Sequence, residues 1–160
     1  MERLEIKKLV DKNDESFEIV CHWHYNWWGK RDGYSMAQII SYVTHSLGED
    51  KIPLTYVALL DQVPVGMYQL LMYDNLIHRP DIYPWLANVF VDAPHRGQGI
   101  CRALMLSVEK HARDIGLEEL FLFTNHDNLY EKFGWEFVED FETFRENSPI
   151  EKLYRLEIKK

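Results

Sequence analysis

Residues 91–101 read VDAPHRGQGIC, and the two glycines in this run stand between a predicted strand and a predicted helix. The strand covers residues 85–91 and is almost entirely apolar, which is typical of a central strand covered on both faces. The helix begins at Ile100 and is amphipathic as far as Gly116. Several backbone N–H groups converge where a strand passes through a glycine turn into a helix, and the helix dipole adds positive potential there. The run therefore suits a phosphate or pyrophosphate ligand.

The same glycines also have an explanation that involves no ligand. A tight strand-to-helix turn needs residues that accept a positive φ, and glycine accepts it most readily. Two familiar phosphate motifs are excluded, because the run lacks both the Gly-x-x-x-x-Gly-Lys-Ser/Thr pattern and the third glycine of a dinucleotide fingerprint. The glycine run alone leaves both explanations open.

The chain on either side of this run predicts an α/β domain. Asn13 or Asp14 begins a helix that ends at Gly29, and a capping box of Ser35 and Gln38 begins a second helix that ends at Gly48. Further strands are predicted at residues 3–9, 56–60, 65–73, 118–123 and 154–158, and a short helix between Asp127 and Gly134.

The order of these elements predicts one domain over residues 1–160. No repeat or linker divides the chain. The strands at 85–91 and 118–123 flank the amphipathic helix, so we expect them to be parallel with a right-handed crossover.

Composition and charge exclude several classes of protein. Apolar residues make up 46% of the 160 residues and charged residues 28%, which argues against disorder. The formal net charge of −8 disfavours a nucleic-acid or anionic-membrane partner. Cys21 and Cys101 are too few for a disulfide framework, and neither a signal peptide nor a membrane-spanning run is predicted. We therefore expect a cytoplasmic protein that binds neither nucleic acid nor membrane.

Two segments resemble the GNAT family of N-acetyltransferases. The run that contains Arg96 and Gly99 resembles the family's acetyl-CoA-binding loop, Gln/Arg-x-x-Gly-x-Gly/Ala. Cys101 departs from the last position of this pattern, although its backbone N–H is retained. Downstream, residues 130–135 read YEKFGW and resemble the Tyr-x-Lys-x-Gly-Phe/Trp segment that closes the family's cofactor site. The resemblance covers most of the chain and is strongest from residue 85 to residue 135.

This resemblance implies a fold and a cosubstrate. The GNAT fold is an α/β fold with a mixed, mostly antiparallel sheet, central splayed parallel strands (here 85–91 and 118–123) and helices on both faces. The cosubstrate is acetyl-CoA, and no metal is implied. The residues expected to bind the cofactor are Phe90, Val91, Arg96, Gly97, Gln98, Gly99, Ile100, Cys101, Asn125 and Tyr130.

The resemblance also implies roles in the reaction. Tyr130 is expected to be the general acid for the departing thiol, because a phenol with a pKa near 10 is protonated at neutral pH. A backbone N–H of Phe90 or Val91 is expected to polarise the thioester carbonyl. Asn88, a polar residue inside an apolar strand, is expected to orient the acceptor amine or a water molecule. The base stays open among several residues, which include Asp74, His78, Asp81, His126 and Asp127.

We expect the acceptor to contact Trp27, Trp28, Asp74 and Trp85. Residues 21–28 read CHWHYNWW, and helical spacing distributes their rings over more than one face, so some rings are available to attract a cation. The predicted function is direct transfer of acetyl from acetyl-CoA to a primary amine through a ternary complex, with a small cationic molecule or a peptide amine as acceptor. The alternatives are a non-catalytic acyl-CoA-binding regulatory module and a protein or peptide N-acetyltransferase. A homodimer is expected by analogy with the family.

Overall fold

The computed structural model describes residues 3–73, 79–141 and 150–160. The predicted residues Asp74 and His78 lie outside this range. Contacts group the chain into two compact units: unit 1 comprises Met1–Leu70 with Asn88–Leu104, and unit 2 comprises Leu71–Ala87 with Met105–Lys160. Strand β4 (Trp85–Val91) and helix α3 (Ile100–Asp114) each contribute residues to both units.

Unit 1 contains an antiparallel array of strands. β1 (Leu4–Lys8) pairs with β2 (Leu54–Leu60), and β2 pairs with β3 (Val63–Leu71). The predicted strands 56–60 and 65–73 leave four residues between them, whereas in the structure Asp61 and Gln62 alone make the turn between β2 and β3, both with positive φ. Such two-residue turns match the twist of the strands that they join.

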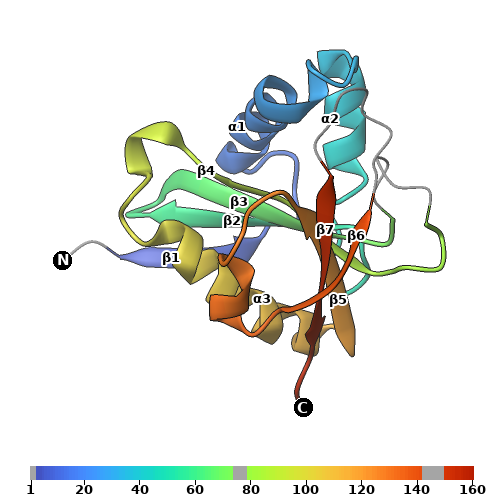
Figure 1. The fold of residues 1–160 in the computed structure, drawn as a ribbon. Coiled ribbons are helices and arrows are strands. Elements are labelled where there is room, and N and C mark those ends of the chain that lie inside the picture. The colour runs from blue at the N-terminus through green and yellow to red at the C-terminus, as the bar shows by residue number, and fades with distance from the viewer. Residues whose placement is uncertain (1–2, 74–78, 142–149) are drawn as a thin grey trace. The chain divides into compact units, whose positions relative to one another are not determined.

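Two helices of unit 1 lie side by side over one face of β2 and β3 (Figure 1). α1 (Glu15–His24) begins where the Asp14 carboxylate accepts a hydrogen bond from the Ser16 N–H at 2.8 Å. α2 (Met36–Thr44) begins with the predicted capping box of Ser35 and Gln38, which is confirmed. α2 ends at Thr44, four residues before the predicted end, and Ser46 then turns back onto it.

The end of α1 differs from the prediction in a way that matters for the site. The chain continues from α1 into a π-helical turn, η1 (Tyr25–Gly29), which the simple helical period does not predict. In this turn Trp27 and Trp28 are consecutive, yet both of their rings contact Phe90, at centroid distances of 5.6 and 6.1 Å. The wider turn therefore brings two neighbouring tryptophans to one residue of β4.

The strands of unit 1 are packed on both of their faces. On the α1 and α2 side, Met67 of β3 is fully buried in a cluster with residues of both helices. On the opposite side, a Cβ on Gly66 would lie 2.8 Å from the Phe90 carbonyl oxygen and 3.3 Å from a methyl group of Leu104. Gly66 therefore allows β4 and the start of α3 to pack closely against β3.

Unit 2 contains the parallel pair of the sheet. β4 pairs with β5 (Glu119–Thr124) in parallel through Trp85 and Phe121, as the sequence predicts. β5 pairs antiparallel with β7 (Glu151–Glu157), and β7 pairs antiparallel with β6 (Glu136–Phe141).

The hydrogen-bonded order of the seven strands is β1-β2-β3-β4-β5-β7-β6. It confirms the predicted α/β class with a mixed, mostly antiparallel sheet.

Candidate functional site

The glycine loop between β4 and α3 is exposed and open. A single 3₁₀ turn, η2 (Ala93–His95), follows Asp92, and Gly97 and Gly99 then adopt φ values of +78° and +82°. A Cβ built on either glycine meets no atom within 4 Å. The glycines therefore satisfy both readings of the sequence: they permit the positive φ of the turn, and they leave the space in front of the loop empty.

The backbone of this loop offers several unused hydrogen-bond donors. The first N–H of the α3 region to find an acceptor is that of Ala103, which donates to the Gly99 carbonyl oxygen at 3.0 Å. Within the described parts of the chain, the six N–H groups before it have no acceptor; they belong to Gly97, Gln98, Gly99, Ile100, Cys101 and Arg102. Donors of this kind at a helix N-terminus attract an anion, so the loop fits the diphosphate of acetyl-CoA.

Arg96 fastens the loop to the rest of unit 1. Its Nε donates to the Val91 carbonyl oxygen at 2.9 Å, and its guanidinium carbon lies 5.0 Å from the Trp27 ring centroid and 5.7 Å from that of Phe90. The sequence predicts Trp27 as an aromatic surface for a cationic acceptor. In the structure the cation beside Trp27 is the protein's own Arg96, so this geometry does not favour that role.

The aromatic rings near the loop form a continuous cluster, defined here as Trp23, Trp27, Trp28, His24 and Phe90. Phe90 is 9% exposed and contacts Trp23 at 5.3 Å, whereas Trp27 is 51% exposed. Most of the cluster is therefore core packing, and the exposed part is at Trp27 and the half-buried Trp28.

His24 is an unusual member of this cluster. It is 8% exposed and lies against the rings of Trp28 and Tyr42, at 5.4 and 5.0 Å. Neither of its ring nitrogens meets a hydrogen-bond partner among the described residues. Burial lowers the pKa of His24 to about 4, because the apolar surroundings disfavour the charged imidazolium. The ring is therefore neutral at physiological pH.

Asn88 lies in β4 with a backbone conformation that is rare for a strand. Its φ of +55° falls in the left-handed region, which asparagine tolerates better than most residues. Its Nδ2 donates to Oε1 of the buried Gln69 on β3 at 2.6 Å. The sequence singles out Asn88 as a polar residue in an apolar strand, but it gives no sign of Gln69 as its partner.

Tyr130 lies in unit 2, in the 3₁₀ turn η3 (Tyr130–Phe133), which ends at Gly134 with φ +88°. The Tyr130 ring is half-buried and contacts the rings of Trp135 and Tyr154, at 6.5 and 6.1 Å. Burial and a hydrogen bond to the Glu131 carboxylate raise the pKa of Tyr154.

The end of this turn agrees with the sequence prediction, whereas its start lies at Leu129 rather than at Asp127. Asn125, which precedes the turn, is exposed.

Trp85 has almost no surface to offer an acceptor. It is 1% exposed, it contacts Phe121 at 6.1 Å and Phe123 at 6.2 Å, and its Nε1 donates to the Ile82 carbonyl oxygen at 2.9 Å. The structure therefore assigns Trp85 to the core of unit 2, against the prediction that it contacts the acceptor. The apolar run from residue 85 to residue 91 already indicates burial.

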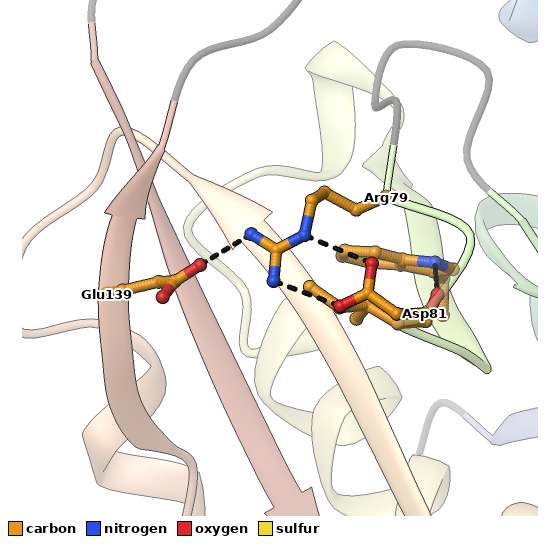
Figure 2. A network of polar contacts seen from close by, with 5 residues as sticks. Arg79, Asp81 and Glu139 are labelled. Carbon is orange, nitrogen blue, oxygen red and sulfur yellow. Dashed lines mark hydrogen bonds and ion pairs between the residues drawn. The ribbon is translucent and has the colours of Figure 1, made fainter.

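The candidate base Asp81 is engaged in an ion pair. Arg79 donates to both carboxylate oxygens of Asp81 at 3.1 Å and to the Glu139 carboxylate at 2.7 Å (Figure 2). The Arg79 guanidinium holds the pKa of Asp81 below its usual range, which makes it a weaker base. Asp127, another candidate, forms an ion pair with Lys152.

The two cysteines differ in their surroundings. Cys21 is 2% exposed, and burial raises its pKa to about 11. Cys101 is exposed at the first turn of α3, and partial burial of its thiol raises its pKa as well.

Across residues 3–73, 79–141 and 150–160, no three histidine, cysteine or acidic side chains are grouped as ligands for a metal ion. No helix in these ranges has the length and apolar character needed to cross a membrane.

The central strand of this mixed sheet leads through an open glycine loop into a helix, and such a junction suits a phosphorylated ligand. Residues 9–135 match the acetyltransferase (GNAT) family. The chain belongs to this family and is an acyltransferase, and the family uses acetyl-CoA.

Solved structures of N-acetyltransferases share this fold at low sequence identity. An aminoglycoside 6'-N-acetyltransferase complexed with coenzyme A has a TM-score of 0.74 and 14% identity, with 98% of each chain covered. An N-acetyltransferase from Staphylococcus aureus Mu50 has a TM-score of 0.71 and 14% identity, with 98% of this chain and 99% of that chain covered.

A spermidine N-acetyltransferase chimera from Vibrio cholerae and hSSAT has a TM-score of 0.73 and 16% identity, with 96% of this chain and 95% of that chain covered. No curated protein matches the sequence.

Proposed function

We propose that this protein transfers the acetyl group of acetyl-CoA directly to the primary amine of a small cationic molecule, with both substrates bound together. The observation that carries the proposal is the row of N–H groups from Gly97 to Arg102 at the start of α3, which have no acceptor among the residues that the structure describes. Family membership makes acetyl-CoA the phosphorylated ligand that these donors would hold.

In this proposal the loop residues bind the diphosphate of acetyl-CoA, and the residues of β4 orient its thioester. The N–H groups from Gly97 to Arg102 would hold the diphosphate, and Arg96 keeps the loop in place through Val91 and Trp27. Bound acetyl-CoA supplies an acetyl group activated as a thioester. An N–H of Phe90 or Val91 would donate to the carbonyl oxygen of that acetyl group and so favour attack at its carbon.

Two side chains would handle the amine and the proton. Asn88 orients the amine, whose nitrogen forms a bond to the acetyl carbon as the carbon–sulfur bond breaks. By resemblance to the family, the Tyr130 hydroxyl would give its proton to the sulfur that departs; the proton lost by the amine passes to water, and Tyr130 regains a proton from water. No residue forms a covalent bond to the acetyl group, so both substrates must be present before a product leaves.

The acceptor class rests on charge and on the related structures. The formal net charge of −8 favours the approach of a cation. Structures that share the fold include enzymes named for an aminoglycoside and for spermidine, both of which carry several amines.

A thiol-release assay tests this function. Acetyl-CoA is incubated with spermidine, an aminoglycoside or a lysine-containing peptide, and calorimetry measures coenzyme A binding separately. We expect thiol release that depends on a small polyamine and a kinetic pattern of a ternary complex. Coenzyme A that gives no heat of binding, or acetyl-CoA that yields no thiol with any amine, would overturn the proposal.

A matched pair of tyrosine variants tests the proton donor. Tyr130→Phe should lower kcat about 100-fold or more while the Kd for acetyl-CoA stays within about twofold. Tyr154→Phe removes a hydroxyl from the neighbouring ring and should change kcat by less than about threefold. Equal effects of the two variants would remove Tyr130 from the mechanism.

A further inference from the structure

A chain of buried polar side chains crosses the interior of unit 1 from β4 to α2. Gln69 and Thr55 are fully buried, and Ser46 is 1% exposed. Gln69 Nε2 lies 2.9 Å from Thr55 Oγ1, and Thr55 Oγ1 lies 2.6 Å from Ser46 Oγ. The chain ends at the Val43 carbonyl oxygen, 2.6 Å from Ser46 Oγ. At the other end, Gln69 Oε1 accepts from Asn88.

The count of hydrogens fixes the direction of every bond in this chain. The Val43 carbonyl oxygen can only accept, so the single hydroxyl hydrogen of Ser46 points to it. Thr55 must then donate to Ser46, which leaves Thr55 Oγ1 to accept from the NH₂ group of Gln69. The Gln69 amide is thereby oriented with its oxygen toward Asn88.

A further donor supports this orientation of Gln69. The Tyr42 hydroxyl lies 3.3 Å from the same Gln69 Oε1 and donates to it. Because that oxygen already faces Asn88, Asn88 must turn its NH₂ group inward. Its own carboxamide oxygen, Oδ1, therefore points away from Gln69.

The freed oxygen lies on the side of the sheet that carries the aromatic cluster. The Asn88 side chain reaches Gln69, which shares its face of β3 with Met67, and Met67 packs in the cluster under α1 and α2. Phe90 contacts Trp23 and Trp27 on the same side. Asn88 is half-buried, so part of the residue is accessible to solvent.

From this geometry we infer that Gln69 is a positioning residue, which holds the NH₂ group of Asn88 so that the Asn88 carboxamide oxygen accepts a hydrogen bond from the acceptor amine. This inference rests on the proposed function. The reversed amide would present N–H groups to an ammonium or amine, which are donors themselves. The buried chain thus selects acceptors that arrive with N–H donors.

Steady-state kinetics with matched variants tests the positioning role of Gln69. The acceptor is whichever amine of the thiol-release assay gives the most turnover. Gln69→Met removes the acceptor for Asn88 and should raise the KM for the amine about tenfold. Thr55→Val, of equal shape but without the hydroxyl, frees Gln69 to flip and should raise this KM about fivefold, and Thr55→Ser should restore most of the loss. Thr44→Val, which removes a hydroxyl at the exposed end of α2, should leave it unchanged.

The KM for acetyl-CoA distinguishes positioning from general damage. It should stay within about twofold in all four variants, because the loop at the start of α3 is untouched. A rise in both KM values together, or an unchanged KM for the amine in Gln69→Met, would overturn the inference. If Gln69→Met does not fold, the comparison of Thr55→Val with Thr55→Ser decides.

Side-chain NMR of the protein without substrates gives a readout that does not depend on turnover. The NH₂ protons of Asn88, identified by their loss in Asn88→Asp, should exchange with water roughly 100-fold more slowly than those of the exposed Asn26. Gln69→Met should abolish this protection. Fast exchange in the wild type would overturn the inference alone, whereas absence of turnover with every amine would overturn the proposed function and the acceptor role with it.

Discussion

The glycine loop and the interior of unit 1 treat polar groups in opposite ways. In the loop, the backbone N–H groups from Gly97 to Arg102 have no acceptor in the described chain, and the space beside Gly97 and Gly99 is open. In the interior, the buried side chains of Gln69, Thr55 and Ser46 are hydrogen-bonded to one another. A binding surface keeps its donors unpaired and exposed, whereas a support for that surface pairs its donors and excludes water.

The largest difference between the two regions should appear in their thiols. Cys101 lies at the open loop, whereas Cys21 is 2% exposed with its pKa raised to about 11 by burial. Iodoacetamide at pH 8 should modify Cys101 roughly 100-fold faster than Cys21, and mass spectrometry of the labelled peptides measures both rates. Coenzyme A should slow the labelling of Cys101. Equal rates would show that the interior opens as freely as the loop.

An effect of similar size concerns stability at low pH. The unfolded chain protonates His24 below a pKa near 6.5, but the folded chain does so only below about 4. Unfolding therefore takes up a proton between these values. The free energy of unfolding should be constant above pH 7 as far as His24 is concerned, and should fall by roughly 3 kcal/mol as the pH drops from 6.5 to 4.

Urea unfolding at a series of pH values measures this loss. His24→Phe should remove the part of the pH dependence that falls between pH 6.5 and 4. His22→Gln, a change at the exposed histidine two residues earlier, should retain it. An unchanged pH profile in His24→Phe would mean that the ring is not desolvated in the folded protein.

A smaller effect separates ligand binding from backbone strain at glycine. Gly99 and Gly116 have nearly equal φ values of +82° and +83°, and a Cβ on either meets no atom within 4 Å. Alanine at either position should cost about 1–2 kcal/mol of stability, because both φ values are left-handed. Only Gly99→Ala should also weaken coenzyme A binding, by about tenfold in calorimetry. Equal affinities of the two variants for coenzyme A would mean that the loop is only a turn and does not bind this ligand.

The smallest effect concerns the attachment of the loop. Arg96→Lys keeps the charge but loses the planar group that bonds the Val91 carbonyl oxygen and covers Trp27, so coenzyme A binding should weaken about threefold. Arg113→Lys is the matched control, because Arg113 also donates its Nε to a backbone carbonyl oxygen, that of Lys159. A loss of more than about tenfold in Arg96→Lys would indicate direct contact with the ligand.

Local patterns predict much of the fold. The apolar run of residues 85–91 gives β4 with its observed bounds, and the capping box of Ser35 and Gln38 gives the start of α2. Each of these depends on neighbours in the sequence. The π-helical turn of residues 25–29 escapes prediction, because its hydrogen bonds differ from the helical period that the apolar residues follow.

Apart from the parallel pairing of β4 with β5, long-range strand pairings could not be predicted. The order β5-β7-β6 places the last strand between two earlier ones, and no short segment encodes this. The candidate site shows the same limit. Glycines mark the loop because the backbone needs them, but the contacts of Arg96 with Trp27 and of Asn88 with Gln69 depend on tertiary structure. The sequence shows Asn88 only as a polar residue in an apolar strand and does not predict its partner.

The left-handed backbone at Asn88 has a consequence for how this sequence can drift. Glycine, aspartate and asparagine are the residues that best tolerate such a φ, and of these asparagine alone carries a donor and an acceptor on one side chain. A lineage that exchanges residue 69 for a donor would gain from aspartate at residue 88, and one that loses the partner would accept glycine. The two positions should therefore covary among descendants of a common ancestor.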